Sequence, residues 1–192
     1  VVKLGAPGES SFPRTTELMR AVNYALLKGE ELKMPVVVNL SFGNNYGGHD
    51  GTALLETYLD SVSSYGRSVI ITGTGNEGAS SIHTSGIFSE KNVPEKIPFS
   101  IGAYETGLSI QLWKNFADIF TITLLHPSGR TVGNIRPEIG TQRIRMEGTE
   151  LLLYYGMPSP YSVSQEIFID FIPVNTYVDT GIWEIILTPE KI

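Results

Sequence analysis

Residues 69–78 read Val69-Ile70-Ile71-Thr72-Gly73-Thr74-Gly75-Asn76-Glu77-Gly78, a β-branched apolar run that breaks abruptly into glycines. Residues 36–43 follow the same pattern: Val36-Val37-Val38-Asn39-Leu40-Ser41-Phe42-Gly43. Apolar runs without alternation are typical of strands buried on both faces of a parallel sheet. One helix-like segment lies between the two runs, so the order is strand, helix, strand. Crossover geometry then places both glycine breaks on one rim of the sheet, where open α/β sheets bind their ligands.

The α/β rhythm extends over residues 1–88. Val1 to Leu4 are predicted to form a strand, and a helix is predicted to begin at Thr15 or Thr16, to include Leu27 and to end at Gly29. Apolar residues at helical spacing define its buried face: Leu18, Ala21, Val22, Ala25 and Leu26. Asp50 or Thr52 is expected to open the helix between the two strands, whose face is Leu55, Tyr58, Leu59 and Val62.

The second half of the chain, residues 97–192, changes to a period of two. Apolar residues alternate with polar ones in several short runs, for example at Leu108, Ile110 and Leu112, and turn signals separate the runs. Short alternating strands at this spacing indicate a β-sandwich or barrel. The joint between the halves is the polar segment 85–98. We therefore predict an α/β domain followed by an all-β domain.

Composition excludes several classes of function. The chain has 192 residues and a formal net charge of −6, and its Lys and Arg residues form no basic stripe that would neutralise nucleic-acid phosphates. It has no cysteine, so thiolate metal sites and a Cys nucleophile are excluded. No apolar run approaches the length of a membrane span. The chain begins with Val1 in what looks like a strand interior, and we expect it to be an internal piece of a longer protein.

The glycines at 73, 75 and 78 match the dinucleotide fingerprint G-x-G-x-x-G. That fingerprint requires a helix to start within the loop, so that pyrophosphate binds at the helix N-terminus. The following residues, Ala79 to Gly86, have no helical apolar face, and no strand ending in an acid follows. These residues by themselves leave a plain chain-turning loop as the main alternative to a ligand site.

The two glycine-ended runs resemble a pair of motifs in the subtilisin-like serine proteases. Residues 36–43 are similar to the family's strand that ends in Ser-Leu-Gly, and residues 74–78 to its Ala-Gly-Asn-Glu-Gly loop. The order and the separation through one helix also agree, and the resemblance covers residues 1–88. It implies a parallel subtilisin-like sheet with helices and a serine endopeptidase activity in the full-length protein.

A narrower resemblance is to the clostridial germination-protease (Csp) branch of that family. The loop Gly43-Asn44-Asn45-Tyr46-Gly47-Gly48-His49-Asp50-Gly51 carries it. Proteins of this branch have a β-sandwich inserted between the Gly-Asn loop and the catalytic serine, which is where the predicted all-β domain lies. The closing run, residues 180–187, resembles the last strands of the jelly-roll modules attached to subtilases.

The resemblance implies roles for seven residues. Asn76 would donate its side-chain amide to the oxyanion of the tetrahedral intermediate, which is usually the largest electrostatic contribution in acyl transfer. Gly73, Thr74 and Gly75 would form one wall of the pocket for the substrate side chain. The segment Ser41-Phe42-Gly43 would pair with an extended peptide substrate through main-chain hydrogen bonds, so that Ser41 is not a nucleophile.

The family's Asp, His and Ser triad motifs are absent from the sequence, so the chain alone is expected to be inactive. Gly51-Thr52-Ala53, next to His49 and Asp50, resembles the serine motif but lies where the family has only a loop. His83 and His126 are expected to be exposed polar residues. With isolated histidines and no spaced acidic partners, no metal site is predicted, although calcium is common in the family.

Two other functions remain open at this point. The branch includes pseudoproteases that have lost the triad and act as binding or signalling partners. Alternatively, the all-β domain binds carbohydrate, a function that exposed aromatic residues clustered on one sheet face would favour. A peptide or protein substrate is the partner expected for the protease, and the oligomeric state is left open.

Overall fold

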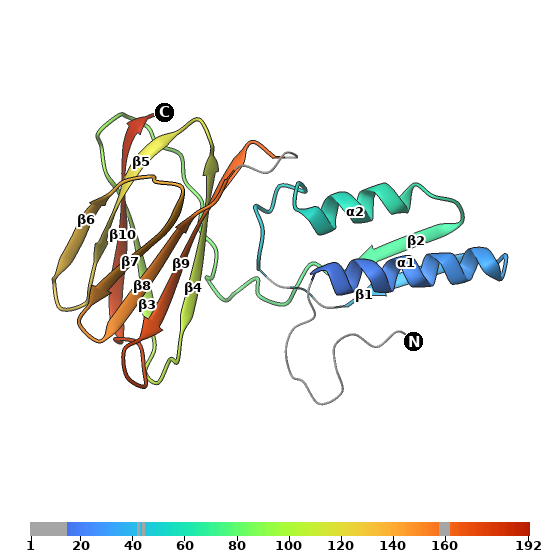
Figure 1. The fold of residues 1–192 in the computed structure, drawn as a ribbon, viewed down its shortest axis with the longest axis horizontal. Coiled ribbons are helices and arrows are strands. Elements are labelled where there is room, and N and C mark those ends of the chain that lie inside the picture. Colours follow the sequence, from blue (N-terminus) through green and yellow to red (C-terminus); the bar gives the residue numbers. More distant parts are fainter. Residues whose placement is uncertain (1–14, 42, 44, 158–161) are drawn as a thin grey trace. The chain divides into compact units, whose positions relative to one another are not determined.

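The computed structural model describes residues 15–41, 43, 45–157 and 162–192. It divides into two compact units, Val1–Thr84 and Ser85–Ile192, which are treated separately below (Figure 1). The predicted strand at Val1–Leu4 and the substrate-segment residue Phe42 lie outside the described residues.

The first unit has the predicted order of elements. It consists of α1 (Thr15–Glu31), β1 (Val36–Leu40), α2 (Leu54–Ser63) and β2 (Ser68–Thr72). β1 and β2 pair in parallel, with Val36 opposite Ser68 and Leu40 opposite Thr72. The strand–helix–strand prediction is confirmed, and the parallel sheet has two strands within the described residues.

The sheet buries one face, not both as its apolar runs predicted. Val38, Leu40 and Ile70 pack with Leu18 and Val22 of α1 and with the apolar face of α2. Residues of the opposite parity are exposed, with Val37 at 68% and Val69 at 55% of full exposure. Because both helices cover the same face, no described residue of this unit forms a layer on the other face.

The end of α1 differs from the prediction that Gly29 caps it. The helix continues through Gly29 to Glu31. Glycine at this position serves packing, because a Cβ there would lie 2.0 Å from Val36 Cγ2 of β1. The actual end is a Schellman motif at Lys33, whose φ is 58°. The Met34 N–H donates to Gly29 O at 2.9 Å, and the Lys33 N–H to Glu30 O at 3.0 Å.

α2 begins at Leu54, later than the predicted start at Asp50 or Thr52. Its N-cap is Ala53, whose N–H donates to the Glu56 carboxylate at 3.0 Å. The Asp50 side chain instead accepts hydrogen bonds from the Thr52 N–H and hydroxyl. Glu56 thus makes the half of a capping box that runs from the third helical residue back to the N-cap N–H, and alanine makes no side-chain cap.

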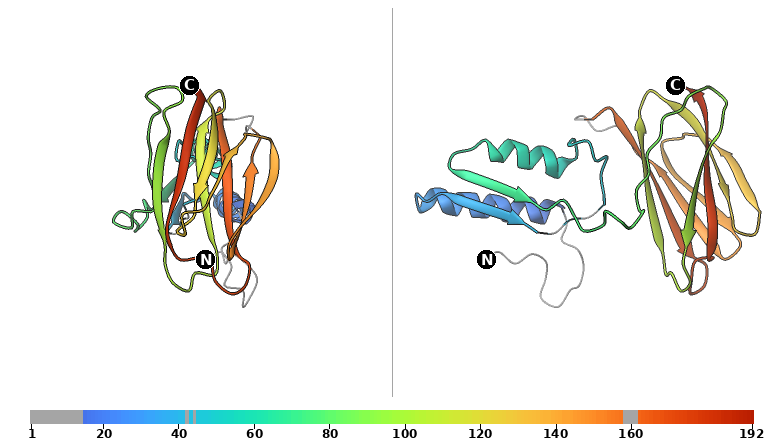
Figure 2. Two further views of the ribbon diagram at one scale, coloured as in Figure 1. Left: turned by 90° about the vertical axis from the view of Figure 1, so that its left-hand side faces the viewer. Right: turned by 180° about the vertical axis from the view of Figure 1, so that it is seen from behind.

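In its described residues, the second unit has the predicted β structure, with eight strands in two antiparallel sheets of four (Figures 1 and 2). The first sheet has the order β3-β10-β5-β6, and the second has the order β4-β9-β8-β7. The first strand therefore pairs with the last, and the second with the second last. The strands are β3 (Glu95–Ile101), β4 (Leu108–Asn115), β5 (Ile119–Leu125), β6 (Thr131–Ile135), β7 (Gly140–Met146), β8 (Thr149–Tyr155), β9 (Ser164–Pro173) and β10 (Gly181–Lys191). The jelly-roll assignment of this sandwich stays a prediction.

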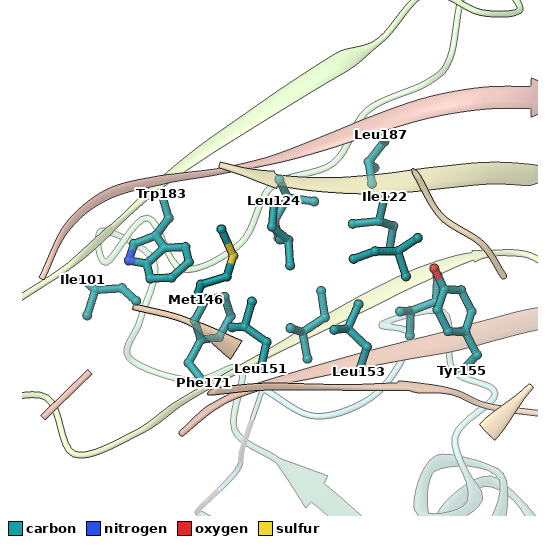
Figure 3. Packing of buried hydrophobic residues seen from close by; sticks show 14 of the residues in the cluster. Ile101, Ile122, Leu124, Met146, Leu151, Leu153, Tyr155, Phe171, Trp183 and Leu187 are labelled. Carbon is teal, nitrogen blue, oxygen red and sulfur yellow. The ribbon is translucent and has the colours of Figure 1, made fainter. Parts of the chain in front are cut away.

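The core of the second unit lies between its two sheets. Figure 3 shows Trp183, Met146 and Phe171 packed together in one region and Tyr155 in another. Trp183 and Tyr155 are both completely buried. The Trp183 indole N–H donates to the Asp179 carbonyl at 3.0 Å, and burial raises the pKa of the Tyr155 phenol. Alternation along the strands points apolar side chains into this core, for example Ile167, Ile169 and Phe171 of β9.

Candidate functional site

The two loops predicted to form the site leave the sheet side by side. β1 and β2 are parallel and in register, so Ser41 follows β1 beside the point where Gly73 follows β2. The Gly73 N–H donates to Leu40 O at 3.1 Å, which continues the ladder one residue past the strands. Both loops therefore start at the carboxyl edge of the sheet, as the crossover argument predicted.

Residues 73–78, which we call the glycine loop, are exposed along their whole length. Gly75 has a φ of +90°, a conformation that L side chains rarely adopt. Just beyond the loop, the Ser80 N–H donates to Glu77 O at 3.0 Å and the Ser80 hydroxyl to the Glu77 carboxylate at 2.7 Å. This turn returns the chain after Asn76 and leaves the Asn76 side chain in solvent.

Ser41 is also exposed, and its hydroxyl accepts a hydrogen bond from the Asn39 amide at 2.5 Å. A serine nucleophile needs a base within hydrogen-bond reach of its hydroxyl. The described partner of Ser41 is an amide donor, which cannot remove a proton. Gly43 on the same loop is exposed, and a Cβ there would meet no atom within 4 Å.

His49 and His83 bring the loop after β1 and the segment after the glycine loop together. Their rings stack with centroids 5.4 Å apart and an interplanar angle of 20°. The expectation that His83 is an exposed polar residue is met, but the stacking was not foreseen. His49 Nε2 lies 3.3 Å from Asn45 O, and the Asp50 carboxylate is bonded to Thr52. This arrangement does not form a His–acid–Ser relay.

His126 is buried, at 6% exposure, which corrects the expectation that it is exposed. Its Nδ1 accepts the Ser128 N–H at 3.0 Å, which assigns the ring proton to Nε2, and Nε2 donates to Asp179 Oδ2 at 3.1 Å. The Ser128 hydroxyl also lies 2.8 Å from Nδ1. The reason for burial is that the ring packs edge-to-face on Trp183, 4.5 Å between centroids.

His126, Ser128 and Asp179 are the residue types of a catalytic triad, but their hydrogen bonds connect turns of the fold and do not activate the serine. The same Nδ1 receives both the backbone N–H and the hydroxyl of Ser128, so the hydroxyl sits in a local turn. Asp179 Oδ2 also accepts the Gly148 N–H at 2.8 Å and the Thr149 hydroxyl at 3.0 Å. The cluster therefore joins the turn after β5 to the β7–β8 turn. His126 and Asp179 are 53 positions apart, so no local sequence pattern predicts that they meet.

Comparison with solved structures finds a protease. The chain is similar to the structure titled "Structure of the Clostridium Perfringens CspB protease", with a TM-score of 0.87 and 26% sequence identity. The match covers 97% of this chain and 40% of that protein. The chain therefore has a protease-like fold and spans about two fifths of the length of the CspB protease. A scan of protein-family models and a search of curated protein sequences found no match.

In the part of the chain that the structure describes, no group of three His, Asp or Glu side chains is placed to hold a metal ion. Neither described helix is long and apolar enough to cross a membrane.

Proposed function

We propose that this chain is the part of a subtilisin-like serine endopeptidase that carries its oxyanion donor and its substrate-binding segment. The observation that carries the proposal is the Gly73 N–H to Leu40 O bond, which sets the Ser41 and Gly73 loops side by side at one sheet edge. The likeness to the CspB protease over 97% of the chain supports it.

In this function Asn76 donates its amide N–H to the oxygen of the scissile carbonyl as that oxygen becomes negative. A fixed donor aimed at the developing charge stabilises the transition state more than the ground state. Gly73, Thr74 and Gly75 form a wall of the pocket for the substrate side chain. Residues 41–43 hold the peptide extended beside β1, with main-chain hydrogen bonds that need no side chain.

Covalent chemistry requires a nucleophile, a base and an orienting acid from elsewhere in the full-length protein. The serine hydroxyl attacks the carbonyl carbon, the base takes the hydroxyl proton and returns it to the leaving amine, and water then hydrolyses the acyl-enzyme. This chain supplies the electrostatic stabilisation of each tetrahedral intermediate. Incubated alone with a fluorophosphonate probe, it is expected to remain unlabelled.

The test is the substitution Asn76→Leu in the full-length protein. Leu has a similar volume but no donor, so kcat should fall by roughly 10²–10³-fold, the magnitude known for the oxyanion asparagine of subtilisin, with KM nearly unchanged. Asn23→Leu is the matched control, because Asn23 is exposed on α1, outside both loops. It should leave kcat unchanged.

Two results would overturn the proposal. An Asn76→Leu enzyme with unaltered kcat and a lowered melting temperature would make Asn76 a residue that only shapes its turn. A full-length protein that the fluorophosphonate probe does not label would instead be a pseudoprotease, with binding as its function.

A further inference from the structure

The outward face of the sheet β4-β9-β8-β7 carries an aromatic patch. Along β9, Ile167, Ile169 and Phe171 point into the core, so Phe168 points outward. Phe168 is directly opposite Gln111 on β4 and Tyr154 on β8. Trp113, two residues from Gln111, pairs with Glu166 and is the diagonal neighbour of Phe168. We call Trp113, Phe168 and Tyr154 the outer aromatic patch.

The patch is open to solvent within its domain. Trp113 is 36% exposed and Tyr154 is 44% exposed, whereas Trp183, the second tryptophan, is fully buried. Three adjacent strands carry the three rings, so the patch extends over about 10 Å across the strands. Aromatic side chains normally fill the core, and a set of neighbouring ones on a solvent face indicates a binding surface.

Hydrogen-bonding groups surround the rings in fixed positions. The Gln111 amide donates to the Glu166 carboxylate at 2.8 Å, and the Ser109 hydroxyl donates to the Asp170 carboxylate at 2.6 Å. A carboxylate accepts about four hydrogen bonds, so both retain acceptor capacity for a ligand. The Glu166 carboxyl is partly buried, and this burial raises its pKa.

We propose that this face binds an oligosaccharide, through the outer aromatic patch and the carboxylates of Glu166 and Asp170. The axial C–H groups of a pyranose ring form an apolar, slightly positive face that stacks on the negative face of an aromatic ring. The sugar hydroxyls donate to the carboxylates and to the other acceptors beside the patch. The proposal is independent of the proposed protease function, since all its residues lie in the β-sandwich.

Two other classes of partner fit this face less well. A peptide that adds a strand would pair with the edge strand β4, which carries Trp113, whereas Phe168 and Tyr154 lie on interior strands whose main chains pair on both sides. An anionic membrane surface attracts clustered cations, whereas the groups beside Phe168 are the acidic Glu166 and Asp170. A neutral ligand with hydroxyl donors and apolar ring faces fits both the rings and the carboxylates.

Trp113 makes the binding test direct. The chain would be titrated with cellohexaose, chitohexaose and xylohexaose by calorimetry and tryptophan fluorescence. These probes differ in the substituents on one kind of pyranose backbone. Saturable binding of at least one probe is expected, with a change in the emission of Trp113. Trp113→Ala and Tyr154→Ala should each weaken it about tenfold.

Tyr104→Ala is the matched control, because Tyr104 is 78% exposed and its ring contacts Tyr177 edge-to-face, apart from the patch. It should leave affinity unchanged. If Trp113→Ala fails to fold, Asp170→Asn serves as the second test. It keeps the side-chain shape and should also weaken binding. The near-ultraviolet signal of buried Trp183 reports folding of each variant. Absence of binding to all three probes, or binding that survives both aromatic substitutions, would overturn the proposal.

Discussion

At the scale of single residues, the Asp179 carboxylate connects segments that are far apart in the sequence. One oxygen, Oδ2, accepts from the His126 ring, the Gly148 N–H and the Thr149 hydroxyl. The Asp179 N–H in turn donates to the Thr149 hydroxyl at 2.9 Å. One carboxylate therefore satisfies donors from two separate turns.

Asp179→Ala should lower the free energy of unfolding of the β-sandwich by about 1–3 kcal/mol, because it leaves partly buried donors without an acceptor. Asp179→Asn keeps one acceptor oxygen and should cost less. Urea unfolding followed by Trp183 fluorescence measures both. Glu190→Ala, at an exposed position, is the control and should stay within about 0.5 kcal/mol of the unsubstituted chain. Equal changes in the free energy of unfolding for Asp179→Ala and Glu190→Ala would show that the hydrogen bonds of Asp179 do not stabilise the sandwich.

Glu166 predicts a pH dependence. Burial raises its pKa above the ordinary value of 4.5, so the folded state holds the proton over a range of pH where the unfolded state has released it. Stability from this group is therefore present below pH 4.5 and is lost as pH rises through the raised pKa. Glu166→Gln removes the ionisation and should be more stable than the unsubstituted chain at neutral pH.

The stability difference should vanish below pH 4.5, where the carboxyl is protonated in both states. Urea unfolding at a series of pH values measures it. Glu166→Gln that is less stable at neutral pH would mean that the charged hydrogen bond from Gln111 outweighs the burial of Glu166.

At the scale of elements, α1 is positioned by two residues near its C-terminus. Gly29 lets β1 approach the helix, and Lys33 ends the helix in a left-handed conformation. Helix propensity alone would favour Ala at position 29 and gives no reason for Lys at position 33. At position 29, the packing of β1 on the helix overrides helix propensity. At position 33, the turn that ends the helix sets the left-handed backbone conformation.

Gly29→Ala should therefore destabilise the α/β unit, because the clash with Val36 costs about 1–3 kcal/mol. Ala gains roughly 1 kcal/mol in a helix, so the net loss should be up to about 2 kcal/mol. Lys33→Gly should stabilise the same unit by about 0.5–1 kcal/mol, because glycine adopts the left-handed conformation without a Cβ penalty. Thermal unfolding followed by the helical circular-dichroism signal tests the pair. Stabilisation by Gly29→Ala would show that the strand does not approach the helix closely.

At the scale of the whole molecule, the two units have unequal cores. Among the described residues, sixteen buried apolar residues form the core of the β-sandwich and three form that of the α/β unit. Burial of apolar side chains is the main source of stability, so we expect the sandwich to be the more stable unit. Phe88, which precedes the first strand of the sandwich, packs on this core, and the centroid of its ring lies 5.4 Å from that of Phe120.

Limited proteolysis should cut first between Ala79 and Ile87, where every residue is exposed and Ile87 reaches 92%. The expected product is a resistant piece that begins near Phe88 and contains the β-sandwich. Mass spectrometry of the early fragments measures the cut. A resistant α/β fragment with a digested sandwich would contradict the difference between the cores.

Local patterns in the sequence predicted most elements of both halves. The β-branched runs before Ser41 and Gly73 predicted two parallel strands, because a buried strand needs apolar residues whatever it packs against. The alternation of apolar and polar residues predicted the all-β half, because neighbouring side chains of a strand point to opposite faces of its sheet. These signals are local, since strand propensity and side-chain period act over a few neighbouring residues.

Tertiary structure alone decided which residues meet across the chain. The runs in β1 and β2 could not show that only one face of their sheet is covered here, because coverage depends on where the helices lie. His126 and Asp179 are 53 positions apart. Trp113, Phe168 and Tyr154 share a face only through the register of three strands. Such pairings are set by packing between distant segments, and no local period encodes them.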